Sequence, residues 1–291
     1  MRSFWLTKGL DVWDISSAEF TANRNFMAQP QGLGLTAKID SFEVERSTFV
    51  ESVKIEPAEI TGELLFADYA QFIRFAEFIG HVELKETIRF YYSTTSKPTD
   101  LLLNTEWYRE VLIKELTKGE IDEYGVLRCE VKFLAVSRWK RDQTITLELA
   151  PFGQPLTYPF FYPYHYGGAN HVAVSIDNRG NLPTHCKVII SAETHTPTFR
   201  VLQNGEVVEQ ARYHVIIRPG SHMVVNSDPA MQEASLYTAG HREDVYHLGE
   251  RDYSYSNFIT IPSGQSMFLF SANNNIFGAV RLEYSLQREL I

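Results

Sequence analysis

A run of prolines and aromatic residues in the middle of the chain, residues 151–168, most restricts what the chain can fold into. Its prolines at positions 151, 155, 159 and 163 fix φ and remove backbone donors, so the run is neither a helix interior nor a central strand. Its aromatic side chains are too apolar for a solvated linker. The run therefore predicts an extended, ordered connector that packs against the flanking domains, with a proline-rich edge strand of the second domain as the alternative.

The chain of 291 residues is long for one hydrophobic core and suits two domains of ordinary size. We therefore predict a first domain at 1–150, the linker at 151–168 and a second domain at 169–291. The two cysteines, Cys129 and Cys186, fall on opposite sides of the linker. A disulfide inside either domain is excluded, which fits folding in a reducing cytoplasm.

The charge balance argues against several classes of partner. The chain has 27 basic and 36 acidic residues, a net charge of −9, and no cluster of lysine and arginine. Recognition of nucleic-acid sequence and adhesion to anionic membranes are therefore not expected. No segment reaches the ~18 apolar residues that span a bilayer, and the first residues lack the pattern of a secretory signal.

Short runs of alternating apolar and polar residues dominate the first domain. The alternation recurs through residues 35–66 and is clearest where Leu127, Cys129, Val131 and Phe133 share one face. Period-two patterning is typical of half-buried antiparallel strands. About eight such strands and one helix predict a mainly β domain of barrel or sandwich type.

One segment, residues 68–80, breaks this pattern and predicts a short helix. It begins with Asp68, which suits an N-cap, and ends with Gly80, which suits the position after a helix. The expected core stripe consists of apolar residues at helical spacing: Tyr69, Phe72, Ile73, Ala76 and Ile79. Phe75 and Phe78 lie off this stripe. We expect these two rings to pack under a loop of their own domain or against a neighbouring subunit.

The second domain has strand patterns separated by Gly, Pro and Asn turns, at intervals typical of an all-β sandwich. Its segment 228–256 is long and polar, with little internal pattern. This segment is predicted to be a surface loop or arm rather than part of the core.

No motif for catalysis or metal binding stands out. Eight of the nine histidines follow residue 164, but none forms a pattern typical of metal ligands. His241, Asp244 and His247 come nearest to a cluster, and we interpret them as solvated polar residues. Nucleophile-elbow and phosphate-binding motifs are absent, and acidic pairs such as Asp11 and Asp14 are better explained as outward-facing charges. We predict no enzyme activity, no cofactor and no metal.

A monomeric carbohydrate-binding protein is the main alternative, because β-sandwiches often hold sugars on aromatic platforms. All four tryptophans lie in the first half of the chain, so the platform would have to be built from tyrosine. The segment 228–256 has tyrosines, including Tyr237, beside histidine and arginine. The candidate contacts to a glycan or a partner in this segment are His241, Tyr246, His247 and Tyr253.

The order of several motifs along the chain resembles the distal tail protein of siphophages. The first domain has an N-terminal strand with Phe and Trp, the single helix at 68–80, and a loop that contains Pro30, Gly32, Leu33 and Gly34. The second domain has two turn motifs, one with Asn178, Gly180 and Pro183, the other with Phe258, Ile261, Pro262 and Gly264. The order and spacing of these motifs carry the resemblance.

The resemblance implies a first domain related to tail-tube proteins and a galectin-like sandwich as the second domain. Six copies would form a ring at the virion tail tip, after synthesis in the cytoplasm of the host bacterium. The expected partners are further copies of this chain, the tail tube protein, a tail-tip or tail-associated protein, and a receptor-binding protein or host surface glycan. DNA would pass through the ring without specific binding. Phe75 and Phe78 are the candidate subunit contacts.

Overall fold

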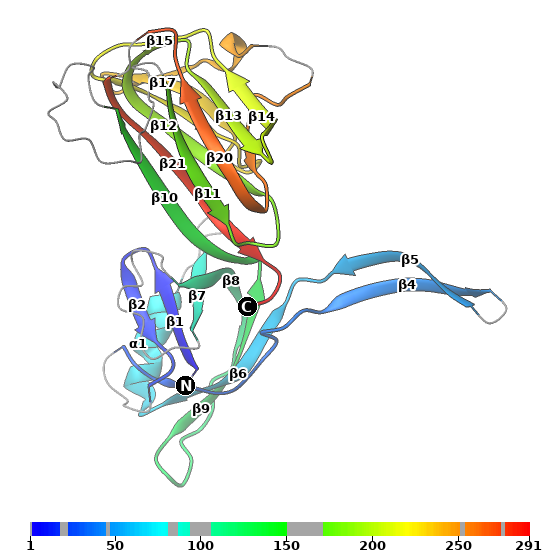
Figure 1. The fold of residues 1–291 in the computed structure, drawn as a ribbon. Helices are drawn as coiled ribbons and strands as arrows, with labels where there is room; N and C mark the ends of the chain where they lie inside the picture. Colours follow the sequence, from blue (N-terminus) through cyan, green and yellow to red (C-terminus); the bar gives the residue numbers. More distant parts are fainter. Residues whose placement is uncertain are drawn as a thin grey trace, which may run out of the picture. The chain divides into compact units, whose positions relative to one another are not determined.

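The computed structural model describes residues 2–17, 23–44, 47–80, 87–93, 106–149, 171–250, 254–274 and 277–291. The chain divides into two compact units (Figure 1). The first unit comprises Met1–Arg141 and Arg288–Ile291, and the second comprises Asp142–Gln287. The predicted connector at 151–168 lies outside the described residues, so its conformation stays a prediction.

The boundary between the units differs from the predicted one at residue 150. It falls after Arg141, inside strand β10 (Trp139–Leu149), and the last four residues of the chain return to the first unit. A strand that continues across a boundary leaves no change in composition, and for that reason the sequence pattern placed the boundary too late.

The chain is mostly β, as predicted, and the described residues contain one α-helix. The first unit has an antiparallel sheet with the strand order β2-β1-β7-β8-β9-β6-β3. Its strands are β1 (Ser3–Lys8), β2 (Asp11–Asp14), β3 (Phe26–Gln31), β6 (Glu59–Phe66), β7 (Ile88–Ser93), β8 (Trp107–Leu116) and β9 (Leu127–Ala135). The ladder does not close into a barrel, because β3 meets the segment after β2 only through isolated bridges such as Ser16↔Phe26.

The core of the first unit follows from the period-two pattern. In β9 the side chains of Leu127, Cys129, Val131 and Phe133 are buried, as their alternation predicted, while Arg128 and its alternate neighbours point outward. Aromatic rings fill much of this core, among them those of Phe66, Phe90, Trp13 and Trp139.

Helix α1 (Tyr69–Ile79) confirms the predicted helix, and the predicted stripe packs against the core in part, through Phe72 and Ile79 among others. The Asp68 carboxylate caps the helix by accepting a hydrogen bond of 2.7 Å from the Gln71 backbone N–H. Phe75 is fully buried, whereas Ile73, expected in the core, is 54% exposed. The buried face also includes the Gln71 side chain, whose amide donates to the Arg24 carbonyl at 2.6 Å.

The second unit is a sandwich of two sheets (Figure 1). The larger sheet has the order β10-β21-β12-β16-β17-β18, and the smaller has the order β11-β20-β13-β14. The larger sheet adds to β10 the strands β12 (Thr184–His195), β16 (Ser221–Asn226), β17 (Glu233–Thr238), β18 (His241–Asp244) and β21 (Phe277–Arg288). The smaller sheet consists of β11 (His171–Asn178), β13 (Thr198–Gln203), β14 (Glu206–Arg212) and β20 (Gly264–Ser271). Two short strands, β15 (Ile216–Ile217) and β19 (Thr260–Ile261), pair with β12.

The segment 228–256 is not the loop or arm that its polarity predicted. Its described residues include β17 and β18, which pair as a hairpin at the edge of the larger sheet, and the 3₁₀ turn η1 (Tyr246–Leu248). All four residues of β18 are exposed. An edge strand with no buried face has no alternation of apolar residues, and this explains why the strand could not be recognised from its sequence.

The two turn motifs of the second unit lie against each other through one side chain. The buried Asn178 amide nitrogen lies 3.1 Å from the Leu182 carbonyl, 3.3 Å from that of Ile261 and 3.0 Å from that of Pro262. Its amide oxygen accepts from the Gly180 N–H at 3.0 Å. Glycine is required at position 180 because an added Cβ would lie 2.6 Å from the Gln287 carbonyl oxygen.

Candidate functional site

The described residues show neither a metal centre nor a reactive thiol. No group of three or more His, Cys, Asp or Glu side chains among them could hold a metal ion. Both cysteines are buried, and burial raises the pKa of the Cys186 thiol to about 12, so this thiol is not a nucleophile near neutral pH. None of the helices in the described part of the chain is long and apolar enough to cross a membrane.

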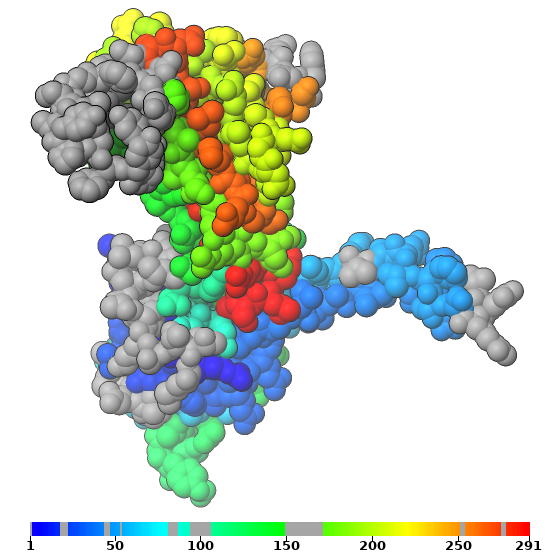
Figure 2. Space-filling model, in the orientation of Figure 1, coloured from blue at the N-terminus to red at the C-terminus, as the bar shows by residue number. Residues whose placement is uncertain are grey.

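A two-stranded ribbon in the first unit presents a group of exposed apolar side chains. It consists of β4 (Ala37–Val44) and β5 (Ser47–Ile55), which pair with each other and with no other described strand. Figure 1 shows the ribbon leading away from β6, and Figure 2 shows it, in blue, projecting from the rest of the first unit. The apolar side chains exposed on it are those of Ile39, Phe42, Phe49, Val50 and Ile55.

The ribbon has a regular aromatic pair. Phe42 and Phe49 are cross-strand partners, and their rings stack with centroids 5.5 Å apart and planes 18° apart. Each of these two rings remains about half exposed. A two-stranded ribbon is at best marginally stable alone in water, and exposed apolar clusters of this kind mark interaction surfaces. The ribbon is therefore a candidate site for contact with another protein chain.

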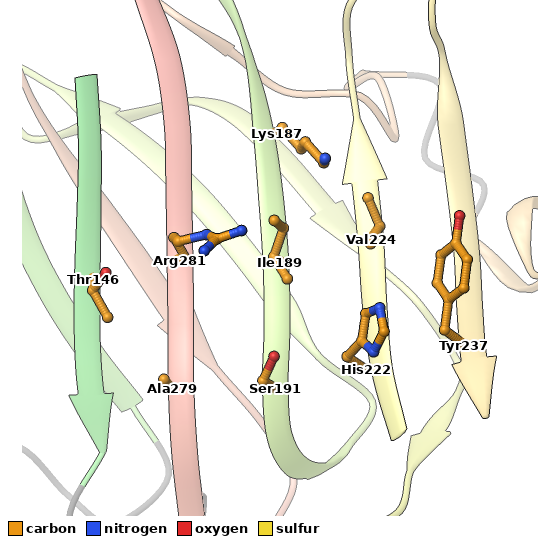
Figure 3. Close-up of a pocket in the computed structure, with 9 residues that line it drawn as sticks. All are labelled: Thr146, Lys187, Ile189, Ser191, His222, Val224, Tyr237, Ala279 and Arg281. Carbon is orange, nitrogen blue, oxygen red and sulfur yellow. The ribbon is translucent and has the colours of Figure 1, made fainter. Parts of the chain in front are cut away.

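A groove on the outer face of the larger sheet is the second candidate site. Figure 3 shows the side chains that line it, which project from β10, β21, β12, β16 and β17. The cavity has a volume of about 580 Å³. The residues that line it are Thr146, Lys187, Ile189, Ser191, His222, Val224, Tyr237, Ala279 and Arg281. We call this site the sheet-face groove.

The alternation of the strands explains how the sheet-face groove is built. In β12 the side chains of Val188 and Ile190 are fully buried, so the alternate residues Lys187, Ile189 and Ser191 face outward. The pairing of β12 with β21 places Arg281 opposite Ile189, in the same row of side chains. The lining residues are thus held by a sheet whose other face is packed in the core.

Two aromatic rings form one side of the sheet-face groove. His222 in β16 and Tyr237 in β17 are cross-strand partners, and their rings stack with centroids 4.9 Å apart and planes 3° apart. The Tyr237 hydroxyl donates to the Glu233 carboxylate, and this hydrogen bond raises the pKa of Tyr237. Tyr237 falls in the segment 228–256 that was predicted to be a loop, and no sequence motif distinguishes His222. Only the register of two strands reveals the pair.

The residues predicted to contact a glycan or a partner do not line the sheet-face groove. His241 lies in the exposed strand β18, and His247 is exposed in η1. Tyr246 is half exposed and stacks on Phe258, with centroids 5.5 Å apart. Tyr253 lies outside the described residues.

Phe75 is not available as a subunit contact. Its ring is buried in the core of its own unit, 5.1 Å from the ring of Trp13 and 5.4 Å from that of Phe66 between centroids. Phe78 is half-buried, with its ring centroid 5.5 Å from that of Trp13. Both rings thus pack within their own domain, which was one of the two expected alternatives.

Residues 7–136 match the family model for the N-terminal domain of distal tail proteins. Among solved structures, the chain is similar to a protein in the baseplate of phage P2 in its activated conformation with calcium. That match has 14% identity, covers 100% of both chains and has a TM-score of 0.61. The Dit protein of phage SPP1, described as a paradigm of the hub adsorption apparatus, matches with 8% identity over 97% of this chain and 98% of that one, with a TM-score of 0.58. No curated protein sequence matches.

The fold places the whole chain in the structural class of these phage baseplate proteins, and the family match places its first domain among the N-terminal domains of distal tail proteins. The prediction made from the order of its sequence motifs is confirmed. More narrowly, residues 7–136 match the N-terminal domain of distal tail proteins, and the chain as a whole shares its fold with the Dit protein of phage SPP1.

Proposed function

We propose that this protein assembles through its first unit into a closed ring of six copies that joins the tail tube to the tail-tip proteins. The second unit would then face the periphery of the baseplate, where it holds receptor-binding or adhesion modules. The net charge of −9 supports a ring through which DNA passes without adhering to the wall.

The exposed ribbon is the observation that carries this proposal. A closed ring requires a heterologous interface, in which one patch of each subunit contacts a different patch of the next. The ribbon leaves its own unit with Phe42, Phe49 and Val50 uncovered. In a closed ring, every ribbon would contact a second copy of this chain. Each ribbon would then bury its apolar side chains against the first unit of the neighbouring subunit.

The oligomeric mass tests the proposal. We expect native mass spectrometry of the full chain to show six times the mass of one chain. Burial of one Phe side chain stabilises a contact by roughly 1.5–3 kcal/mol. Replacing both rings, by Phe42→Ser with Phe49→Ser, should therefore weaken each subunit contact by about a hundredfold or more.

A matched control separates this effect from a general loss of exposed aromatic surface. Tyr124 is 79% exposed in the first unit but lies outside the ribbon, so Tyr124→Ser should leave the ring intact. Circular dichroism should show the same strand content in all three proteins. A full chain that stays monomeric at its highest soluble concentration, or a ribbon variant that still forms the ring, would contradict the proposal.

A further inference from the structure

We propose that the sheet-face groove binds an anionic saccharide, a sugar that carries a phosphate or carboxylate group. In this proposal the His222–Tyr237 pair packs against the sugar ring, and Lys187 and Arg281 contact the anionic group. The proposal goes beyond the ring assembly and does not depend on it, because every lining residue belongs to the second unit.

The charges in the groove point to an anionic ligand. Among the described residues that line it, Lys187 and Arg281 carry charge and none is a carboxylate, whereas Glu283 borders the groove as the cross-strand partner of Lys187 and the ion-pair partner of Arg281. Lys187 forms no ion pair with any residue that the structure describes. The Arg281 Nε lies 2.9 Å from the Glu283 carboxylate, which steadies the guanidinium and leaves its terminal nitrogens as further donors. Charge-assisted hydrogen bonds from such groups are stronger than neutral ones.

The other side of the groove suits the sugar ring. The parallel rings of His222 and Tyr237 combine a flat apolar surface with polar edges. Hydroxyl groups from Ser191 and Thr146 line the same cavity and can exchange hydrogen bonds with sugar hydroxyls. All these side chains project from strands rather than from loops, so their positions are fixed before a ligand arrives.

The size and place of the groove favour a saccharide over an acidic protein segment. Its volume of about 580 Å³ falls within the roughly 300–1,000 Å³ that is typical of small-ligand sites. A stable protein contact buries about 800 Å² on each partner, which requires a broader surface. The groove also lies on a sheet face, where an extended peptide cannot pair with free strand edges.

Retention on a glycan array tests the proposal with the full chain. The array presents the same hexoses in neutral, carboxylated and phosphorylated forms, beside an acidic peptide. We expect retention on the anionic sugars, with at most a tenth of that signal on their neutral forms. Lys187→Gln with Arg281→Gln should remove this preference, and Tyr237→Ala should lower retention on both kinds of sugar.

Two controls keep the result specific. Met231→Ala changes an exposed side chain that does not line the groove and should not alter retention. Thermal unfolding and native mass should be the same for all variants, so that a loss of binding is separated from a loss of fold or of the ring. Competition by inorganic phosphate should be at least tenfold weaker than competition by the phosphorylated sugar.

Several outcomes would overturn the proposal. Absence of retention on every anionic sugar, or unchanged retention in the double variant, would show that the groove does not bind an anionic saccharide. Equal competition by inorganic phosphate would reduce it to an anion site without sugar recognition. Retention on the acidic peptide alone would assign the groove to a protein partner instead.

Discussion

The side chain of Asn178 connects two turns of the second unit by hydrogen bonds. Its amide contacts the carbonyls of Leu182, Ile261 and Pro262 and the N–H of Gly180. The two turn motifs that contain these residues are about eighty positions apart in the sequence, a separation at which only tertiary contacts act. Both motifs can be recognised in the sequence from the family resemblance. The contact between them, which explains why they occur together, cannot.

Replacing Asn178 should therefore destabilise the second unit. Asn178→Ala leaves buried carbonyls and one N–H without their partner, which costs about 2–4 kcal/mol of unfolding free energy. Asn181→Ala, in the same turn but with an exposed side chain, should change it by less than about 0.5 kcal/mol. Urea unfolding followed by fluorescence compares the two. Equal midpoints for the two variants would show that the amide does not hold the turns together.

Helix α1 shows which part of an element can be predicted from its sequence. Its two ends were predicted correctly, because Asp68 and Gly80 are local signals. Its buried face was predicted only in part, because Phe72 and Ile79 pack against the core as expected but a buried glutamine with satisfied hydrogen bonds looks the same in a sequence as an exposed one. Sequence-based prediction is limited in the same way for the ribbon and the sheet-face groove. Alternation predicts strands, but not what covers them or which residues lie side by side across two strands.

The helix offers a direct test of the buried face. Phe75→Ala removes a fully buried ring and should cost about 3–5 kcal/mol of unfolding free energy. Ile73→Ala, on the exposed face, should cost less than about 1 kcal/mol. The pattern of apolar residues alone predicts the opposite order. Thermal unfolding of the two variants distinguishes the two assignments. A larger loss of stability for Ile73→Ala would show that Ile73 lies in the core, as the apolar pattern predicted.

At the scale of the molecule, the length of the chain predicted two domains, but the four C-terminal residues were assigned to the wrong one. In the first unit, the buried guanidinium of Arg109 donates to the Glu289 carbonyl at 3.0 Å and lies 4.7 Å from the centre of a Trp139 ring. The Glu289 carboxylate lies 2.6 Å from Nε of Arg138. Burial lowers the pKa of Arg109 because it disfavours the charged form. No local pattern in the last residues reveals these contacts.

Removing residues 288–291 should therefore destabilise the first unit. The deletion leaves Arg109 buried without its carbonyl partner, which costs about 1–3 kcal/mol. Removing only residues 290–291, whose side chains are exposed, should have little effect. Differential scanning calorimetry compares the transitions of the two shortened chains. Identical unfolding profiles would mean that Glu289 contributes nothing to the first unit.

The return of the last residues also determines when each unit can be finished during synthesis. In sequence terms the second unit is an insertion between Arg141 and Arg288 of the first. The ribosome therefore completes the second unit before it supplies the final residues of the first. A chain that has supplied these residues to its first unit has therefore already been synthesised through its second unit.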